Sequence, residues 1–363
     1  MAGVQQRVQV GQTFRRDVDS YGRTLCVLFT TKGFVPVVHH GLMLNLLGLH
    51  HVTAVSSSIR ANKQFYTGAL GMRLVKRSVN QDDTSAYHLF YAGSQATPGS
   101  DLTFFDWNVP RERRGNHTVS GTGLCVNGEA ALTWWQARLD GLGAAVGEVR
   151  EQGGRLTLPL QDPEGQRLTL TDDGGTGVAY PWDASPVPAE YQIRGLGPVM
   201  MSVPNLYPTD RVLQKLLNMT PISTYLHPDK AAYTVHVYRI GTQGSPQAGP
   251  GNELHVAVRP DLEAAQPGAG GVHHLAFNIP DADYDAWTKR LHHLGVQSSG
   301  PVDRYYFRSL YFREPNGVLF ELATQGPGFA VDEDVATLGE KLALPPFLEG
   351  QRAQILAGLK PID

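Results

Sequence analysis

Cysteine is scarce in this sequence, with only Cys26 and Cys125 among 363 residues. Two cysteines cannot build a disulfide framework, and they cannot supply the thiolates of a structural zinc site or an iron–sulfur cluster. These classes are therefore excluded. The scarcity also favours a reducing compartment, so we expect a cytoplasmic protein.

An excess of charge of either sign is also missing. The 31 basic and 34 acidic residues leave a formal net charge of -3, which does not favour binding to nucleic acid or to an anionic membrane surface. The longest apolar window near the start, about residues 34–49, is interrupted by His39, His40 and Asn45 and is too short to span a bilayer. We expect a small neutral partner, no nucleic acid and no membrane, and a homo-oligomer remains open.

Glycine and proline are plentiful by contrast. The chain holds 40 glycines and 24 prolines at an apolar content of 41%. This composition is typical of a turn-rich globular protein with many short elements and is not that of a helical bundle.

A βαβββ order of elements first appears in residues 48–107. A strand-like run at 48–55 contains the doublet His50-His51, and a helical spacing of apolar residues follows over 59–70. Three further strand-like runs lie at 73–79, 86–91 and 102–107. We call this pattern a module.

The same module recurs at a fixed offset. Residues 135–143 align with 287–295, and residues 162–170 align with 314–322, both at an offset of 152 residues. The first pair shares Trp, Arg, Leu, Leu and Gly, and the second pair opens on tight turns that lead into a last strand. A further unit of the same kind covers about 195–258, which gives four modules.

These observations predict an α+β fold of four βαβββ modules. The expected divisions are an N-terminal extension that can be disordered (1–45), modules one and two (46–172), a Gly- and Pro-rich linker (173–193), modules three and four (194–325) and a C-terminal tail with a helix near 346–359 (326–363). Met43 is a candidate start of the folded chain. Phe347, Ile355 and Leu359 of the tail are expected to pack on the body.

A second histidine doublet, His273-His274, lies in a strand-like run of module four, and Glu321 stands alone in the apolar run 318–323. A buried carboxylate is costly unless it is paired or binds a cation. One histidine of each doublet, His51 and His274, would complete a two-histidine, one-carboxylate set with Glu321. Such a set holds one face of an octahedral metal and is the pattern of non-haem Fe(II) oxygenases. Asp106 is a rival carboxylate at the end of its strand.

The internal repeat offers a check on this hypothesis. At the offset of 152, His274 falls on Thr122 and Glu321 falls on Thr169. The copy keeps the helix and the turn but replaces both candidate ligands, so the module can be built without them. This favours a metal site over a structural role.

The modules, the two histidine doublets and the aromatic hairpin at 304–317 that leads to Glu321 together resemble the hydroquinone-type ring-cleaving dioxygenases. These belong to the vicinal oxygen chelate superfamily, which also holds glyoxalase I, extradiol catechol dioxygenases and bleomycin-resistance proteins. The resemblance covers about residue 46 to the C-terminus. It implies two half-barrels of paired modules, with modules one and four facing each other around one metal.

The resemblance also implies the site residues. The implied metal is Fe(II), with Mn(II) as another metal that fits, and its implied ligands are His51, His274 and Glu321. The implied supporting or catalytic residues are His50, Thr53, His273, Arg304 and Tyr311. Its implied partners are a small aromatic hydroquinone and O2.

Three other functions remain open from the sequence. One is an extradiol dioxygenase that acts on catechols, and another is a glyoxalase-type isomerase that uses zinc or nickel. The isomerase usually needs a second carboxylate, which the centre of the strand near 102–105 does not offer. The third is a metal-free protein that binds an aromatic compound.

Overall fold

The structure is a computed structural model that describes residues 7–8, 12–18, 24–30, 33–37, 44–241 and 249–363. The chain divides into two units, Met1–Leu44 and Asn45–Asp363, and each is described by itself. The first unit contains the antiparallel strands β1 (Arg7–Val8), β2 (Gln12–Val18), β3 (Thr24–Thr30) and β4 (Gly33–Val37), in that order. The predicted extension 1–45 nearly coincides with this unit. Its disorder stays a prediction, and Met43 lies outside the described residues.

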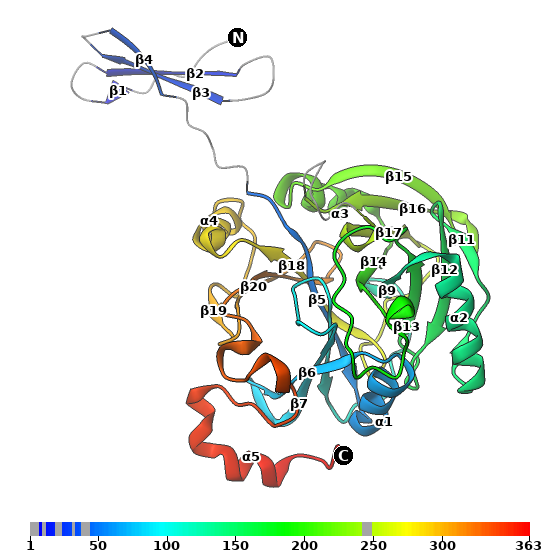
Figure 1. The fold of residues 1–363 in the computed structure, drawn as a ribbon. Coiled ribbons are helices and arrows are strands. Elements are labelled where there is room, and N and C mark those ends of the chain that lie inside the picture. Colours follow the sequence, from blue (N-terminus) through cyan, green and yellow to red (C-terminus); the bar gives the residue numbers. More distant parts are fainter. Residues whose placement is uncertain (1–6, 9–11, 19–23, 31–32, 38–43, 242–248) are drawn as a thin grey trace. The chain divides into compact units, whose positions relative to one another are not determined.

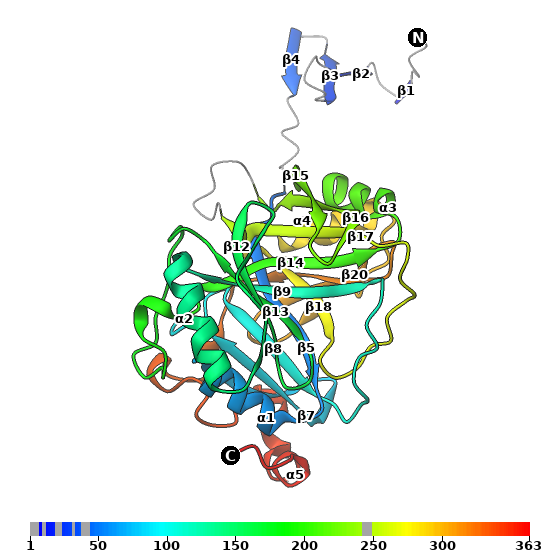
Figure 2. The same ribbon diagram turned by 90° about the vertical axis from the view of Figure 1, so that its right-hand side faces the viewer.

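The second unit is built on two large sheets (Figures 1 and 2). Sheet I combines modules one and four in the order β19-β20-β21-β18-β5-β8-β7-β6. Its strands are β5 (Gly48–Ser56), β6 (Arg73–Asn80), β7 (Asp83–Ala92), β8 (Asp101–Asp106), β18 (Val272–Ile279), β19 (Val302–Asp303), β20 (Arg308–Arg313) and β21 (Leu319–Thr324).

Sheet II combines modules two and three in the order β10-β12-β13-β9-β14-β17-β16-β15, with β11 pairing β12. Its strands are β9 (Thr118–Val126), β10 (Ala145–Val146), β11 (Arg150–Gln152), β12 (Arg155–Gln161), β13 (Arg167–Asp172), β14 (Gly195–Val203), β15 (Thr220–His227), β16 (Lys230–Arg239) and β17 (Glu253–Val258). The predicted α+β fold of four modules in two half-barrels is confirmed, and each sheet takes one module from each half of the sequence. The division into ranges 46–172, 173–193, 194–325 and 326–363 stays a prediction.

The helices follow the predicted places. They are α1 (Ile59–Lys63), η1 (Gln64–Ala69), α2 (Gly128–Gly141), η2 (Ala189–Tyr191), α3 (Leu206–Arg211), η3 (Val212–Leu216), η4 (Pro250–Asn252), η5 (Asp281–Asp283), α4 (Tyr284–His293), η6 (Phe329–Val331), η7 (Val335–Thr337), η8 (Pro346–Gln351) and α5 (Arg352–Gly358). No helix in the described part of the chain is long and apolar enough to cross a membrane.

The repeated Trp and Arg of α2 and α4 have a structural reason. Trp135 and Trp287 are fully buried. Arg138 Nε donates to Ala69 O at the end of η1, and Arg290 Nε donates to Leu216 O at the end of η3. Each arginine therefore satisfies carbonyls that a helix end leaves without partners, and each ties one module of a sheet to a module of the other sheet.

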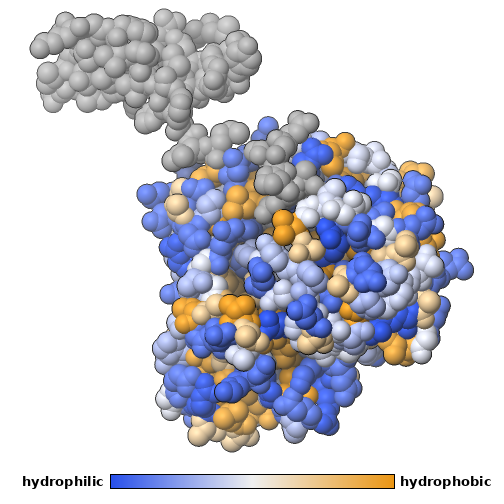
Figure 3. Space-filling view, viewed as in Figure 1, coloured by the Kyte–Doolittle hydropathy of each residue, from blue (hydrophilic) through white to orange (hydrophobic). Residues whose placement is uncertain are grey.

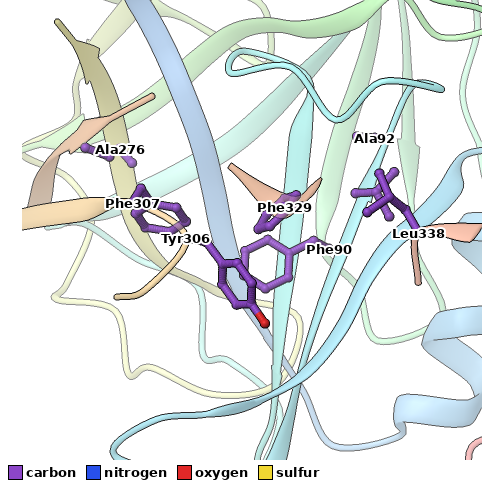
Figure 4. Packing of buried hydrophobic residues seen from close by; sticks show 9 residues of the cluster. Phe90, Ala92, Ala276, Tyr306, Phe307, Phe329 and Leu338 are labelled. Carbon is purple, nitrogen blue, oxygen red and sulfur yellow. The ribbon is translucent and has the colours of Figure 1, made fainter. Parts of the chain in front are cut away.

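A cluster of buried apolar residues lies beside the predicted site (Figure 4). The Phe329 ring packs against Phe90 and Tyr306, with ring centroids 4.8 and 5.4 Å apart. Phe307 extends this cluster to the doublet of β5, at 5.1 Å from the His50 ring and 5.5 Å from the His51 ring. The cluster fixes one wall of the site.

The C-terminal tail is held on this cluster by a fully buried lysine. Lys76 Nζ donates to Phe329 O at 3.0 Å and to Asp332 Oδ1 at 2.8 Å, pairs with Glu333, and lies 4.6 Å from the centre of the Tyr306 ring. Further along the tail Ile355 is buried as predicted, but the prediction for Phe347 is wrong because its side chain is 60% exposed. The short 3-10 helix η8 turns Phe347 outward. On the face of the molecule that Figure 3 shows, hydrophobic and hydrophilic residues are interspersed.

Candidate metal centre

Three buried side chains converge at the centre of Sheet I. His51 on β5, His274 on β18 and Glu321 on β21 place their ligand atoms together. His51 Nε2 lies 3.1 Å from His274 Nε2, and Glu321 Oε2 lies 3.2 Å from the first and 2.9 Å from the second. The structure therefore brings together the three residues that the sequence predicts as ligands.

The spacing of these atoms fits one face of an octahedron. A metal–ligand distance of about 2.1 Å places two cis ligands about 3.0 Å apart. The three observed separations, 2.9 to 3.2 Å, agree with that edge length. Two imidazoles and one carboxylate are also the donor set of mononuclear Fe(II) sites, so these residues could hold such a metal.

Two β-bulges aim the histidine doublets. In the pairing of β5 with β18, Ala276 lies opposite His51 and Phe277 opposite Leu49, so that His50 is an extra residue. His273 is the extra residue of the other strand, between the pairs Val272–Ala54 and His274–Thr53. Simple alternation predicts that the two rings of a doublet face opposite sides, but a bulge redirects the side chain. Each first histidine therefore reaches its neighbour's ring.

The hydrogen bonds of His50 fix the proton on His51. His50 Nε2 lies 3.0 Å from Thr324 O, which can only accept, so that nitrogen carries the proton. Burial, and then the neighbouring His51, lower the pKa of His50 to about 3, so the ring is neutral and its Nδ1 accepts. His51 Nδ1, at 2.9 Å, must donate to it. In the neutral tautomer with the proton on Nδ1, His51 Nε2 offers a free lone pair, which is the form that binds a metal.

The second doublet repeats this contact. His273 Nδ1 lies 2.8 Å from His274 Nδ1, and burial lowers the pKa of His273 to about 3. Burial also lowers the pKa of His274, although the nearby Glu321 opposes the shift. A neutral His273 can accept from His274 Nδ1 and so orient His274 Nε2 toward the shared centre.

Glu321 is ionised although it is fully buried. Burial by itself would raise the pKa of this carboxyl, but His51 and His274 hold it well below its usual range. Its other oxygen, Oε1, accepts a hydrogen bond of 2.5 Å from the buried Ser309 Oγ. This leaves Oε2 directed at the two imidazoles. The sequence analysis missed Ser309, which alternation along β20 could have found because Ser309 and Tyr311 lie on one face of that strand.

Arg304 and Tyr311 lie together at one side of the centre. Arg304 Nε donates to the Tyr311 hydroxyl at 3.3 Å, and Arg304 Nη2 pairs with the exposed Asp82 at 2.9 Å. The Tyr311 ring lies edge-on to His274, with centroids 5.7 Å apart. Burial, more than Glu321, raises the pKa of Tyr311, so the phenol keeps its proton near neutral pH.

Thr53 does not reach the small cavity of this site. Its hydroxyl lies 2.8 Å from Thr103 Oγ1, which in turn lies 3.0 Å from His88 Nε2. Thr103 occupies the place in module one that Glu321 has in module four. In the strand pairing, Thr103 lies opposite Thr53, and His51 precedes Thr53 by two residues. In the same way Glu321 lies opposite Ala276, and His274 precedes Ala276 by two residues. A threonine therefore stands where a second carboxylate ligand would be needed.

His88 is a second residue that the sequence analysis missed. Its ring lies between those of Phe90 and Phe105, at 4.0 and 4.4 Å, and burial lowers its pKa well below the usual range. His88, His51, His274, Arg304 and Tyr311 line a cavity of about 50 Å³ together with aromatic rings. An isolated histidine in a strand carries no signal of its own, so only the fold reveals this position.

Asp106 does not join the metal centre. Its Oδ1 accepts a 2.6 Å hydrogen bond from Lys360 Nζ in the C-terminal tail, and burial raises its pKa. It is not among the described residues that converge with His51 and His274. Asp106 instead fastens the tail to module one.

The strand pairing corrects one counterpart in the repeat. Glu321 lies opposite Ala276 of β18, and Thr169 lies opposite Gly123 of β9. Thr169 is therefore the counterpart of Glu321, as the offset of 152 predicts. His274 precedes Ala276 by two residues, so its counterpart is Gly121 and the prediction of Thr122 is wrong by one position. The strand β9 is shifted by one residue relative to the sequence alignment. Sheet II still lacks the ligand.

Comparison with known proteins agrees with this geometry. The family described as the glyoxalase/bleomycin resistance protein/dioxygenase superfamily matches residues 48–180 and 195–322. "Putative ring-cleaving dioxygenase MhqA" of Bacillus subtilis (strain 168) is 44% identical over 321 residues, which cover 87% of this chain and 99% of that protein. "Chlorohydroquinone/hydroquinone 1,2-dioxygenase" of Sphingobium indicum UT26 is 30% identical over 326 residues, which cover 85% of this chain and 94% of that protein.

Solved structures are similar as well. The crystal structure titled as a putative dioxygenase from Bacillus subtilis superposes with a TM-score of 0.79 at 32% identity and covers 88% of this chain and 98% of that one. Glyoxalase I from Zea mays has a TM-score of 0.55 at 16% identity, over 77% of this chain and 92% of that one, and shares the fold. The chain therefore belongs to the glyoxalase/bleomycin resistance protein/dioxygenase superfamily and, within it, to the ring-cleaving dioxygenases.

Proposed function

We propose that this protein is a non-haem Fe(II) dioxygenase that cleaves the ring of a hydroquinone with O2. The observation that carries the proposal is the set of three cis-spaced ligand atoms on His51, His274 and Glu321. The Sphingobium relative, which is named for chlorohydroquinone and hydroquinone, supports this substrate class. Mn(II) is a metal that the same oxygen and nitrogen donors would also accept.

A bound Fe(II) would favour the phenolate form of the substrate and provide open positions for O2. The chain's own residues would orient the ring. The Arg304 guanidinium can stabilise negative charge on a substrate oxygen, and the Tyr311 hydroxyl, which keeps its proton, can donate to such an oxygen. His50 and Thr53 are positioning residues in this proposal, because their polar atoms are engaged by Thr324, His51 and Thr103.

His273 has a different place in the proposal. Its ring packs against Phe105 and Trp107, with centroids 5.5 and 5.4 Å away, and its Nδ1 meets the ring of His274. Through that contact we expect it to set the orientation of the ligand His274.

Aromatic side chains would hold the substrate ring. Phe90, Phe105, Tyr306 and Phe307 line the cavity, whose volume of about 50 Å³ holds roughly one or two water molecules. A diphenol therefore enters only when a lining side chain moves. The pair between Arg304 and the exposed Asp82 lies at the cavity, and an ion pair with a solvent-exposed partner costs little to open.

A catechol remains the competing substrate. A glyoxalase-type isomerization is less favoured, because Thr103 stands in the place of the second carboxylate that such a site uses. A metal-free binding protein would not need three ligand atoms at the edge length of a coordination octahedron.

The test is metal content and O2 uptake. Protein purified without oxygen should retain about one iron per chain and should consume O2 with methylhydroquinone or chlorohydroquinone faster than with catechol. Faster uptake with catechol would reject the hydroquinone assignment. Absence of bound iron together with absence of uptake for all three diphenols would reject the dioxygenase proposal.

A further inference from the structure

The pseudo-equivalent position in Sheet II is hollow where Sheet I has its ligands. Gly121 and Thr169 of Sheet II are the counterparts of His274 and Glu321. The counterpart of His51 is Pro198, because Pro198 precedes Met200 by two residues as His51 precedes Thr53. A Cβ on Gly121 would meet only Met200 Cβ within 4 Å, at 3.8 Å. The loss of the large ligand side chains leaves a cavity of about 640 Å³.

This cavity is lined by cationic side chains. Arg114, Arg150, Arg155, Arg167, Lys230 and Arg259 line it, and Asp229 is the one acidic residue among its described lining residues. A lining with this balance attracts anions. The question is which of these charges are already neutralised by acids outside the lining.

Three of the arginines are paired. Arg150 Nη1 lies 3.0 Å from Asp229 Oδ1, and Arg155 makes a two-pronged pair with Glu253 at 2.8 and 2.9 Å. Arg259 makes a similar pair with Asp261 through two bonds of 2.8 Å. These contacts shape the wall and leave little positive charge for a ligand.

Arg167 and Arg114 are different. Arg167 makes only a loose ion pair, with Glu112, whose Oε2 lies 3.9 Å from Arg167 Nη2 and is too far for a hydrogen bond. Arg114 donates only to neutral oxygens, Gln161 Oε1 and Gly165 O, both at 2.7 Å. Burial lowers the pKa of Arg167. The Glu112 carboxylate opposes this shift and the positive charge of Arg114 adds to it, so the pair with Glu112 offsets only part of the repulsion between the two guanidinium groups.

Hydroxyl groups stand on the same side of the strand as Arg167. Arg167, Thr169 and Thr171 alternate along β13 and all line the cavity. Apolar atoms of Pro159, Met200 and Leu262 complete the wall. The site thus offers a planar guanidinium fork, neighbouring hydroxyl donors and room for a carbon skeleton much larger than an inorganic ion.

We propose that the Sheet II cavity binds a small organic acid, with its carboxylate held by Arg167 and Arg114 and its apolar part against Met200 and Pro159. An arginine fork matches the two oxygens of a carboxylate, and a bound anion would relieve the repulsion between the two guanidinium groups. This site lies in the sheet that carries no metal ligands, and its occupation does not depend on the dioxygenase proposal.

The test is titration calorimetry on the full chain with benzoate, with benzamide as the neutral probe of the same shape and with inorganic phosphate. We expect saturable benzoate binding, at least 10-fold weaker binding of benzamide and of phosphate, and at least 10-fold weaker benzoate binding to R167Q. R211Q removes an equal charge from α3, outside the cavity lining, and should bind benzoate like the wild type.

R114Q is the second variant, because Arg114 is exposed and its replacement does not threaten folding. R114Q should also weaken benzoate binding, so it tests the site even if R167Q does not fold. The proposal is overturned if benzoate does not bind, or if benzoate binds equally to every variant, which would place it elsewhere. It is also overturned if phosphate binds as well as benzoate, since that would mean a simple anion site.

Discussion

Ser309 Oγ donates a hydrogen bond of 2.5 Å to Glu321 Oε1, and both side chains are fully buried. This contact occupies the carboxylate oxygen that faces away from the two imidazoles. A hydroxyl that fixes a ligating carboxylate is as much a part of a metal site as the ligand, because it sets the direction of the free oxygen.

Ser309→Ala should therefore weaken metal binding by about 10- to 100-fold. The reason is that Glu321 loses the bond that holds its orientation and keeps a buried oxygen without a donor. Competition with a fluorescent chelator measures the affinity. Ser202→Ala, which removes a buried serine hydroxyl from Sheet II, should leave the affinity unchanged. Equal affinity of S309A and the wild type would show that the contact does not position Glu321.

His51→Ala should abolish both metal retention and O2 uptake, because two ligands remain of three. Thr122→Ala should spare both properties, since Thr122 lies in Sheet II, away from the metal centre. Metal analysis of the purified variants and an oxygen electrode measure the two properties. The distinction between the two sheets would be wrong if both variants lost metal, or if both kept it.

Lys76→Met should lower the free energy of unfolding by about 3 kcal/mol. The substitution leaves Asp332 and Glu333 beside each other without the buried cation that Lys76 supplies, and it removes the donor to Phe329 O. Urea unfolding measures the loss, and limited proteolysis should show earlier cleavage within 329–344. Lys289→Met on the exposed side of α4 is the control and should change stability by less than about 0.5 kcal/mol.

His88 should make the metal-free protein sensitive to mild acid. Burial chiefly lowers its folded pKa, with His51, His274 and Arg304 adding to the shift and Glu321 opposing it. Below about pH 6.5, His88 therefore binds a proton in the unfolded chain but not in the folded protein. The free energy of unfolding decreases as the pH is lowered through this range.

The matching variant is His88→Gln, which can keep a bond to Thr103 but does not titrate. Between pH 7.5 and pH 5.5 the wild type should lose about 1 kcal/mol more stability than this variant. Thermal unfolding in the presence of a chelator across that range measures the difference. Parallel curves for the two proteins would mean that His88 takes up its proton as readily in the folded protein as in the unfolded chain.

Much of the fold could be predicted because the modules repeat. The Trp and Arg of 135–143 and 287–295 mark two helices whose arginines close the helix ends of other modules. The ligand positions could be predicted because a lone glutamate in an apolar strand and two histidine doublets are unusual combinations. The one-residue error at Thr122 arose because sequence alignment cannot detect a shift in strand register.

Other features depend on contacts between distant residues. Alternation places Ser309 on the same face of β20 as Tyr311, but its contact with Glu321 exists only when β20 pairs with β21, and His88 reaches the site only when β7 joins Sheet I. The exposure of Phe347 follows from the turn of η8, which a pattern of apolar residues does not reveal.

The sequence by itself determined the modules, the three candidate ligand residues and the family, because periodicity, repeats and unusual residue types are local properties. Only the tertiary structure decided how the histidines are aimed, since the bulges at His50 and His273 exist only where β5 pairs with β18. It also decided that Sheet II holds a cationic cavity where Sheet I holds ligands. Charge pairing between distant side chains sets that difference, and no stretch of sequence contains it.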